Sequence, residues 1–82
     1  MNQIIYQPKA LKQLRKIPAQ QQIREKIKLL SNMPDCINVK SLSGHLYQYR
    51  LRVGHYRVFF NFDGAISIVS IEEVKKRDER TY

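Results

Sequence analysis

Basic side chains gather in the second half of the chain, on alternate residues of two predicted strands and in the stretch after the last strand. They are Arg50, Arg52 and Arg57, then Lys75, Lys76 and Arg77, with Tyr82 after them. Cationic side chains bind phosphate oxygens, and an aromatic ring can stack on a nucleotide base. This combination predicts a surface for a phosphodiester backbone, with RNA as the first candidate ligand.

The arginines and Tyr82 include groups that RNA cleavage by the 2′-hydroxyl requires. That reaction needs a base for the hydroxyl, cations for the pentavalent phosphorane, and an acid for the departing 5′-oxygen. Arg50 and Arg57 would supply the cations. The cations that precede Tyr82 favour the ionised form of its phenol, so Tyr82 would act as the base or stack on a nucleotide base.

His45 and His55 are the only imidazoles in the chain. They fall at the start of one predicted strand and at the turn that enters the next, at opposite edges of one predicted hairpin. An imidazole titrates near neutral pH, and a pair can serve as base and acid on RNA. A histidine at a turn is also a common polar surface residue, and both interpretations stay open.

Six residues are expected to contact RNA around the arginines: Gln48, Arg52, Lys75, Arg77, His45 and His55. The alternative is an ordinary exposed sheet face followed by a charged tail. Four acids in that tail nearly cancel its cations, namely Glu72, Glu73, Asp78 and Glu79. No acid occurs among the outward positions of the two basic strands, so neither a carboxylate base nor a metal site is expected there.

Length and composition predict one domain spanning residues 1–82. The chain has 15 Lys and Arg against 7 acids and a net charge of +8, which favours an anionic partner. The single Cys36 cannot form an internal disulfide, and no Cys/His spacing is typical of zinc, so a cytoplasmic protein without a cofactor is expected. No run approaches the ~18 apolar residues of a membrane span.

Hydrophobic periodicity predicts an α+β fold in which an N-terminal strand and a helical hairpin precede an antiparallel meander. The expected elements are a strand at 2–6, helices at 9–17 and 19–32, a loop at 35–44, and strands at 46–52, 55–62 and 65–71. The last strand, apolar on both faces, is expected inside the sheet. From Glu72 onward we expect a short helix or an ordered extension, and Asp63-Gly64 predicts a hairpin turn.

Alternation assigns each predicted strand residue to a face of the sheet. Tyr47, Tyr49 and Leu51 should face the helices, which leaves Arg50 and Arg57 on the opposite face. Neighbouring strands lie within about 5 Å, so the cations should crowd together there.

In this order of elements the chain resembles the RelE/ParE toxin superfamily of bacterial type II toxin–antitoxin systems. The resemblance covers nearly the whole chain and is carried by Leu42-Ser43-Gly44, by the run from His55 to Phe60, and by the basic tail that ends in Tyr82. It implies a microbial RNase-like fold. It also implies a metal-independent active site at Gln48, Arg50, Arg57, Lys76 and Tyr82, in which Gln48 departs from the family by being neutral.

The resemblance implies a toxin that cleaves mRNA in the A site of the 70S ribosome, close to 16S rRNA, and inhibits translation. A cognate antitoxin would neutralise it, and operator DNA would be met only through the antitoxin complex. The alternative is a ParE-like toxin that inhibits DNA gyrase by protein contact and has no nuclease activity. A third interpretation is a non-toxic protein that binds RNA or sequesters an antitoxin.

Overall fold

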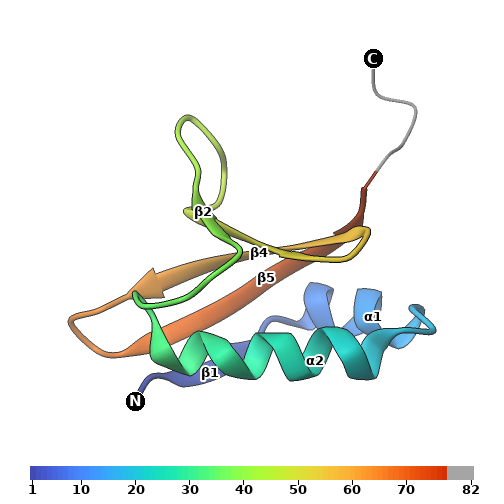
Figure 1. The fold of residues 1–82 in the computed structure, drawn as a ribbon, viewed down its shortest axis with the longest axis horizontal. Coiled ribbons are helices and arrows are strands. Elements are labelled where there is room, and N and C mark those ends of the chain that lie inside the picture. The colour runs from blue at the N-terminus through green and yellow to red at the C-terminus, as the bar shows by residue number, and fades with distance from the viewer. Residues whose placement is uncertain (78–82) are drawn as a thin grey trace.

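The computed structural model describes residues 1–77. They form a five-stranded sheet with helices on one face (Figure 1). The helices are α1 (Pro8–Arg15), α2 (Gln20–Lys28) and the short 3₁₀ helix η1 (Leu29–Asn32). The strands are β1 (Gln3–Tyr6), β2 (Val39–Ser41), β3 (Tyr49–Val53), β4 (Tyr56–Asp63) and β5 (Ile68–Lys76). The predicted α+β class, with a strand and two helices before an antiparallel meander, is confirmed.

The sheet has the order β1-β5-β4-β3-β2, with β1 parallel to β5 and every other pair antiparallel. The last strand is therefore internal, as predicted. The expected loop at 35–44 contains β2, which pairs with the outer edge of β3; three residues are too few to show a period in the sequence. Of the two structures expected from Glu72 onward, the short helix is wrong for residues 72–76: they are ordered and extended, and pairing with β4 carries β5 on to Lys76 instead of ending it at Ile71.

Both helices bury an apolar stripe on the same face of the sheet. Pro8 starts α1 at a position where its missing N–H costs nothing, and Ala10 and Leu14 are fully buried. Ile23 and Ile27 form the stripe of α2. These side chains pack against the inner face of the strands, where Phe60 has no exposed surface. The predicted second helix, 19–32, ends in a 3₁₀ turn instead of continuing as an α-helix.

The strand predicted at 46–52 begins only at Tyr49, and residues 42–48 form a loop on the face away from the helices (Figure 1). Side chains replace the ladder here: the Gln48 amide N–H donates to Asn61 Oδ1, and the Phe62 amide N–H donates to Gln48 Oε1. Because Tyr47 lies in this loop and not in a strand, its side chain does not follow the strand alternation. It lies against Phe59 instead of facing the helices with Tyr49, so its predicted orientation is wrong.

A β-bulge on β5 changes which residues reach the outer face, away from the helices. Phe59 is opposite Glu73 while Phe60 is opposite Ile71, so Glu72 is an extra residue on β5. Ile71 is therefore buried in the core while Glu73, two residues later, lies on the outer face with Phe59. The bulge thus reverses the alternation for the rest of β5.

Candidate nucleic-acid interface

Strand register arranges the outer face of the sheet in two neighbouring rows. The first row crosses three strands and contains Arg52, Arg57 and Lys75. The second crosses four strands and contains Lys40, Arg50, Phe59 and Glu73. Directly opposed residues have Cβ atoms about 4.5–5.5 Å apart. The predicted clustering of the three strand arginines on one face is therefore seen in the register.

A polar pocket of about 240 Å³ opens where the first row meets the β3–β4 turn. Its lining, which we call the arginine pocket, consists of Arg50, Arg52, Gly54, Tyr56, Arg57 and Arg77. Gly54 makes the turn with a φ of 56°, a conformation that favours glycine. Among residues 1–77, the lining holds four guanidinium groups and no carboxylate. Like charges opposed on a sheet destabilise folding, so the pocket is better suited to a bound anion than to stability.

Arg50 has a buried polar atom without a partner in the described residues. Its Nε is buried and has no hydrogen-bond partner within residues 1–77. Buried polar groups almost always have a partner, and an unpaired donor costs about 1–3 kcal/mol. Together with the absence of acids in the pocket lining, this unpaired donor indicates a side chain adapted to something other than the stability of the isolated fold.

The cations at the end of β5 do not all lie on the same face of the sheet. Lys75 lies on the outer face beside Arg57, whereas Lys76 is in register with Tyr56, on the alternate position. Arg77 lines the arginine pocket, and its backbone N–H donates to the His55 carbonyl. The structure therefore brings Arg77, and not Lys76, to the strand arginines; Tyr82 lies outside the described residues.

The remaining predicted RNA contacts do not lie in the arginine pocket. Gln48 is engaged with β4 through its side chain and backbone and lines a separate shallow hollow with Asn61. His55 is in the β3–β4 turn and lines the groove between α2 and β3, whereas His45 stacks on Phe59 on the outer face, so the two histidines lie in different places. Their predicted use as an acid and base pair gains no support from these positions.

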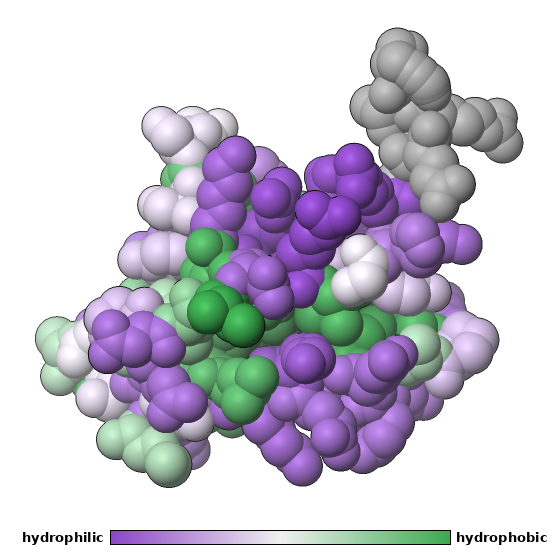
Figure 2. All heavy atoms as spheres, viewed as in Figure 1, coloured by the Kyte–Doolittle hydropathy of each residue, from purple (hydrophilic) through white to green (hydrophobic). Residues whose placement is uncertain are grey.

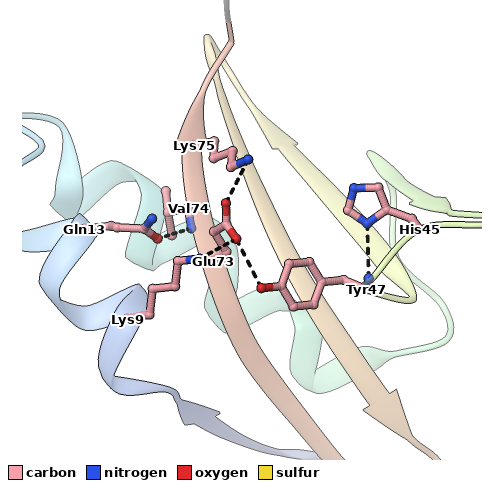
Figure 3. A network of polar contacts seen from close by, with 7 residues as sticks. All are labelled: Lys9, Gln13, His45, Tyr47, Glu73, Val74 and Lys75. Atoms are coloured by element: carbon pink, nitrogen blue, oxygen red, sulfur yellow. Dashed lines mark hydrogen bonds and ion pairs between the residues drawn. The ribbon is translucent and has the colours of Figure 1, made fainter.

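Glu73 is a residue that sequence reasoning missed. It is only 5% exposed and accepts hydrogen bonds from Lys9 Nζ at 3.0 Å and the Tyr47 hydroxyl at 3.1 Å (Figure 3). Lys75 Nζ makes an ion pair with its other oxygen at 3.1 Å. Burial raises the pKa of the Glu73 carboxyl, but hydrogen bonds from Lys9, Lys75 and Tyr47 outweigh it and leave that pKa below its ordinary value. We call these four residues the Glu73 network.

The Glu73 network ties three parts of the chain together. Lys9 comes from α1, Tyr47 from the 42–48 loop, and Glu73 and Lys75 from β5. Burial and the hydrogen bond to Glu73 raise the pKa of Tyr47, so its phenol stays protonated and donates. Beside the network, the Gln13 side chain accepts from the Val74 backbone N–H and caps β5 beyond the end of β1 (Figure 3). The network holds the loop and the helix onto the sheet.

An apolar groove of about 550 Å³ runs between α2 and β3, on the opposite side of the sheet from the Glu73 network. Figure 2 shows apolar side chains there between two hydrophilic bands. Ile23, Leu51 and Val53 contribute to its lining, and Leu29 and Ile37 at its rim are 50% and 80% exposed. Exposed apolar surface of this kind marks an interaction site more often than a free surface.

Within residues 1–77, no group of three His, Cys, Asp or Glu side chains is placed to hold a metal ion. None of the helices there is long and apolar enough to cross a membrane.

The sequence and the fold both resemble known toxins. The family model described as the ParE toxin of type II toxin–antitoxin systems, parDE, matches residues 4–81. No curated protein matches the sequence. In solved structures, a chain of the Mycobacterium tuberculosis RelBE2 toxin–antitoxin complex matches with a TM-score of 0.80 and 25% identity, over 93% of this chain and 98% of that one.

Two further structures share the fold at lower identity. The archaeal RelE–RelB complex from Pyrococcus horikoshii gives a TM-score of 0.79 and 23% identity, over 98% of both chains. The isolated Escherichia coli RelE toxin gives 0.79 and 19%, over 96% of this chain and 87% of that one. The described residues therefore share the fold of these proteins.

Proposed function

We propose that this chain, which belongs to the ParE toxin family of type II toxin–antitoxin systems within the RelE/ParE superfamily, is a ribosome-dependent endoribonuclease. Its target is mRNA in the A site of the 70S ribosome, and its effect is to inhibit translation. The observation that carries the proposal is the arginine pocket, in which four guanidinium groups converge and to which no carboxylate of residues 1–77 contributes.

The arginine pocket suits the charge that develops during RNA cleavage. Attack of the 2′-oxygen on the adjacent phosphorus, with loss of the hydroxyl proton to a base, forms a phosphorane with two charged equatorial oxygens. Collapse of the phosphorane breaks the bond to the 5′-oxygen, which takes up a proton, and leaves a 2′,3′-cyclic phosphate. Guanidinium groups bind such oxygens in pairs and remain charged at any physiological pH. Arg50 and Arg57, on directly paired strands, stabilise these oxygens in our proposal. Cations that are already in position contribute most when charge appears in the transition state.

The cation from the end of the chain is Arg77 in this proposal, in place of Lys76. Arg77 shares the pocket with the strand arginines, whereas Lys76 stands on the alternate position of β5. Tyr82 keeps the role expected from the sequence, as the base for the 2′-hydroxyl or as a ring that stacks on a nucleotide base. The pair Tyr82→Ala and Tyr82→Phe distinguishes these roles, since phenylalanine stacks but cannot transfer a proton.

Positioning by the ribosome compensates for the neutral Gln48. The Gln48 side chain accepts a hydrogen bond from the Phe62 backbone N–H, and the Gln48 backbone N–H donates to Asn61, both on β4. The neutral Gln48 side chain adds no charge to the pocket. Free mRNA should then be cleaved poorly, because the substrate must be oriented by 16S rRNA and the A site. The net charge of +8 favours ribosome binding at low salt. An acidic antitoxin that covers the cationic face and the apolar groove would block ribosome binding and mRNA cleavage. In this proposal the toxin acts in the cytoplasm, and it meets operator DNA only through the complex with the antitoxin.

Inhibition of DNA gyrase is the second candidate. It is favoured by the description of the matched family model, which names ParE toxins, and by the apolar groove, which is suited to contact with another protein. Protein contact through the groove would need neither the arginine pocket nor any nuclease chemistry. The two candidates therefore assign function to different faces of the molecule.

Pulse labelling of cells after induction tests the proposal. For an mRNA endonuclease, methionine incorporation should fall within minutes while thymidine incorporation continues. The Arg57→Ala variant should leave both unaffected, whereas Leu29→Ala, in the groove, should act like the wild-type protein. An earlier fall in thymidine incorporation that persists in Arg57→Ala and disappears in Leu29→Ala would support gyrase inhibition and refute the nuclease.

A further inference from the structure

Three aromatic rings form a cluster on the outer face, separate from the hydrophobic core. The His45 ring stacks on Phe59 with a centroid distance of 5.1 Å and an interplanar angle of 10°. The Tyr47 ring is 5.8 Å from His45 and 5.9 Å from Phe59. Phe59 is 7% exposed and is absent from the core cluster, so these rings are what covers it.

The His45 ring has one face turned away from its stacking partner. Phe59 stacks on the other face, the Tyr47 ring lies at a tilt of 45° to it, and the residue as a whole is exposed. Among residues 1–77, Phe59 is the one ring that stacks on His45, so the face turned away from Phe59 is the one left for a ligand.

The His45 ring is also held in place. Its Nδ1 accepts a hydrogen bond of 3.1 Å from the Tyr47 backbone N–H, which fixes the ring and leaves the hydrogen of the neutral ring on Nε2 (Figure 3). The Tyr47 hydroxyl is anchored in turn on Glu73, whose charge is balanced by Lys9 and Lys75. A side chain fixed before binding loses less entropy when a ligand arrives.

Strand register places the cluster next to the arginine pocket. Phe59 lies directly opposite Arg50, and Arg57 is two residues away on the same face of β4. Two residues along a strand span about 6.6 Å. A nucleotide whose phosphate is bound by the arginines can therefore extend its base over the His45 ring.

We propose that the face of the His45 ring turned away from Phe59 is a stacking site for one base of the RNA strand whose phosphate occupies the arginine pocket. This inference rests on the proposed function, because it takes RNA as the ligand. Stacking uses the π-face that all four bases share, so the site contributes affinity and registration without selecting a sequence. The ribosome and the arginines would then bind the backbone while His45 fixes one base.

Binding of a fluorescently labelled single-stranded hexaribonucleotide at low salt tests the stacking site directly. We expect His45→Ala to weaken binding about 10-fold or more, the range that base–aromatic stacking supports. His45→Phe keeps a planar ring and should bind nearly as well as the wild-type protein. Leu46→Ala, an 82% exposed neighbour in the same loop, is the matched control and should change nothing.

A hexamer of the same length without bases separates stacking from loop structure. It should bind the wild-type protein and His45→Ala equally, because it has no base to stack. In cleavage on ribosomes, His45→Ala should raise KM and leave kcat within about 2-fold, as expected when binding is lost equally from substrate and transition state. Thermal unfolding establishes that each variant is folded.

Equal weakening of the two hexamers by His45→Ala, or failure of His45→Phe to restore binding, would overturn the stacking site in favour of a structural role. If Arg57→Ala abolishes binding and His45→Ala has no effect, the stacking site is wrong and the proposed nuclease survives. If the wild-type protein binds neither RNA nor ribosomes, both are wrong.

Discussion

The arginine pocket and the Glu73 network are neighbours on one face of one sheet, but they treat positive charge in opposite ways. In the network, Lys9 and Lys75 both meet the carboxylate of Glu73. In the pocket, Arg52 on β3 lies opposite Arg57 on the neighbouring β4, and none of the acids in residues 1–77 lines it. Charge that the fold itself balances supports the structure, whereas charge left unbalanced is available for a ligand.

The network also limits the positive region. Lys75 stands beside Arg57 in the first row, and Glu73 withdraws its ammonium group toward the second row. The strongest field is therefore centred on the guanidinium groups instead of being spread along β5. The comparison predicts that substitutions in the pocket change activity and not stability, and that substitutions in the network do the reverse.

The largest expected effect is that of Arg57→Ala. Removing one preorganised donor from a developing anion costs roughly 10²-fold or more in rate, and we expect that loss in ribosome-dependent mRNA cleavage. Stability should stay the same or rise slightly, because Arg57 lies between the like charges of Arg52 and Lys75. Primer extension on a ribosome-bound mRNA and thermal unfolding measure the two effects.

The control for Arg57→Ala is Lys28→Ala, which removes the same charge from an exposed site on α2. It should change cleavage less than about 2-fold, since distant surface charges are screened at physiological salt. Equal losses in the two variants would mean that net charge alone matters. The pocket would then have no special role, and the contrast with the network would fail.

Arg77→Ala and Lys76→Ala sharpen the comparison at the end of β5. Arg77 lines the pocket and Lys76 stands on the alternate position, so we expect about a 10-fold or greater loss of cleavage for Arg77→Ala. Lys76→Ala should change cleavage less than about 2-fold. The reverse order of effects, measured in the same primer-extension assay, would restore Lys76 as the tail cation.

Periodicity was enough to predict most of the fold and the strand arginines. Apolar spacing located both helices, and the alternation of β3 and β4 placed Arg50 and Arg57 on the face away from the helices. It failed for β2, whose three residues show no period, and for the 42–48 loop, where Gln48 and Asn61 replace backbone pairing with side-chain hydrogen bonds.

The bulge at Glu72 explains why the rest of the site could not be predicted. The charged composition from Glu72 onward indicates a tail, and unbroken alternation from Ile71 would put Glu73 in the core, where an unpaired carboxylate is costly. One extra residue reverses the alternation and puts Glu73 among the cations. A bulge depends on contacts between strands, and nothing in the local sequence of β5 marks its position.

Glu73→Gln should lower stability, in contrast to Arg57→Ala. Glutamine has nearly the same shape but leaves two ammonium groups and the Tyr47 hydroxyl with a poorer acceptor. We expect a loss of about 1–2 kcal/mol in the free energy of unfolding, from hydrogen bonds to a charged group. Both lysines are exposed, so their ion-pair contribution is small. Urea unfolding measures the loss, with Glu25→Gln on the exposed surface of α2 as the control.

A decrease of less than about 0.5 kcal/mol for Glu73→Gln would show that the network is not a structural element. In that case Glu73, like the pocket arginines, would serve ligand binding and not the stability of the fold. Full cleavage activity in a destabilised Glu73→Gln variant, assayed well below its unfolding temperature, would keep the two regions distinct.

The smallest expected effect is the pH dependence of the stability that Glu73 provides. Its pKa is lower in the folded protein than in the unfolded chain, so the ionised carboxyl stabilises the fold. That stability is fully present above the ordinary carboxyl pKa of about 4.3 and is lost as pH falls through the lower, folded value. The difference in unfolding free energy between the wild-type protein and Glu73→Gln should therefore be constant near neutrality and shrink in acid. A difference that grows as pH falls would mean that the folded carboxyl prefers to be protonated, and Glu73 would then not be the group that balances Lys9 and Lys75.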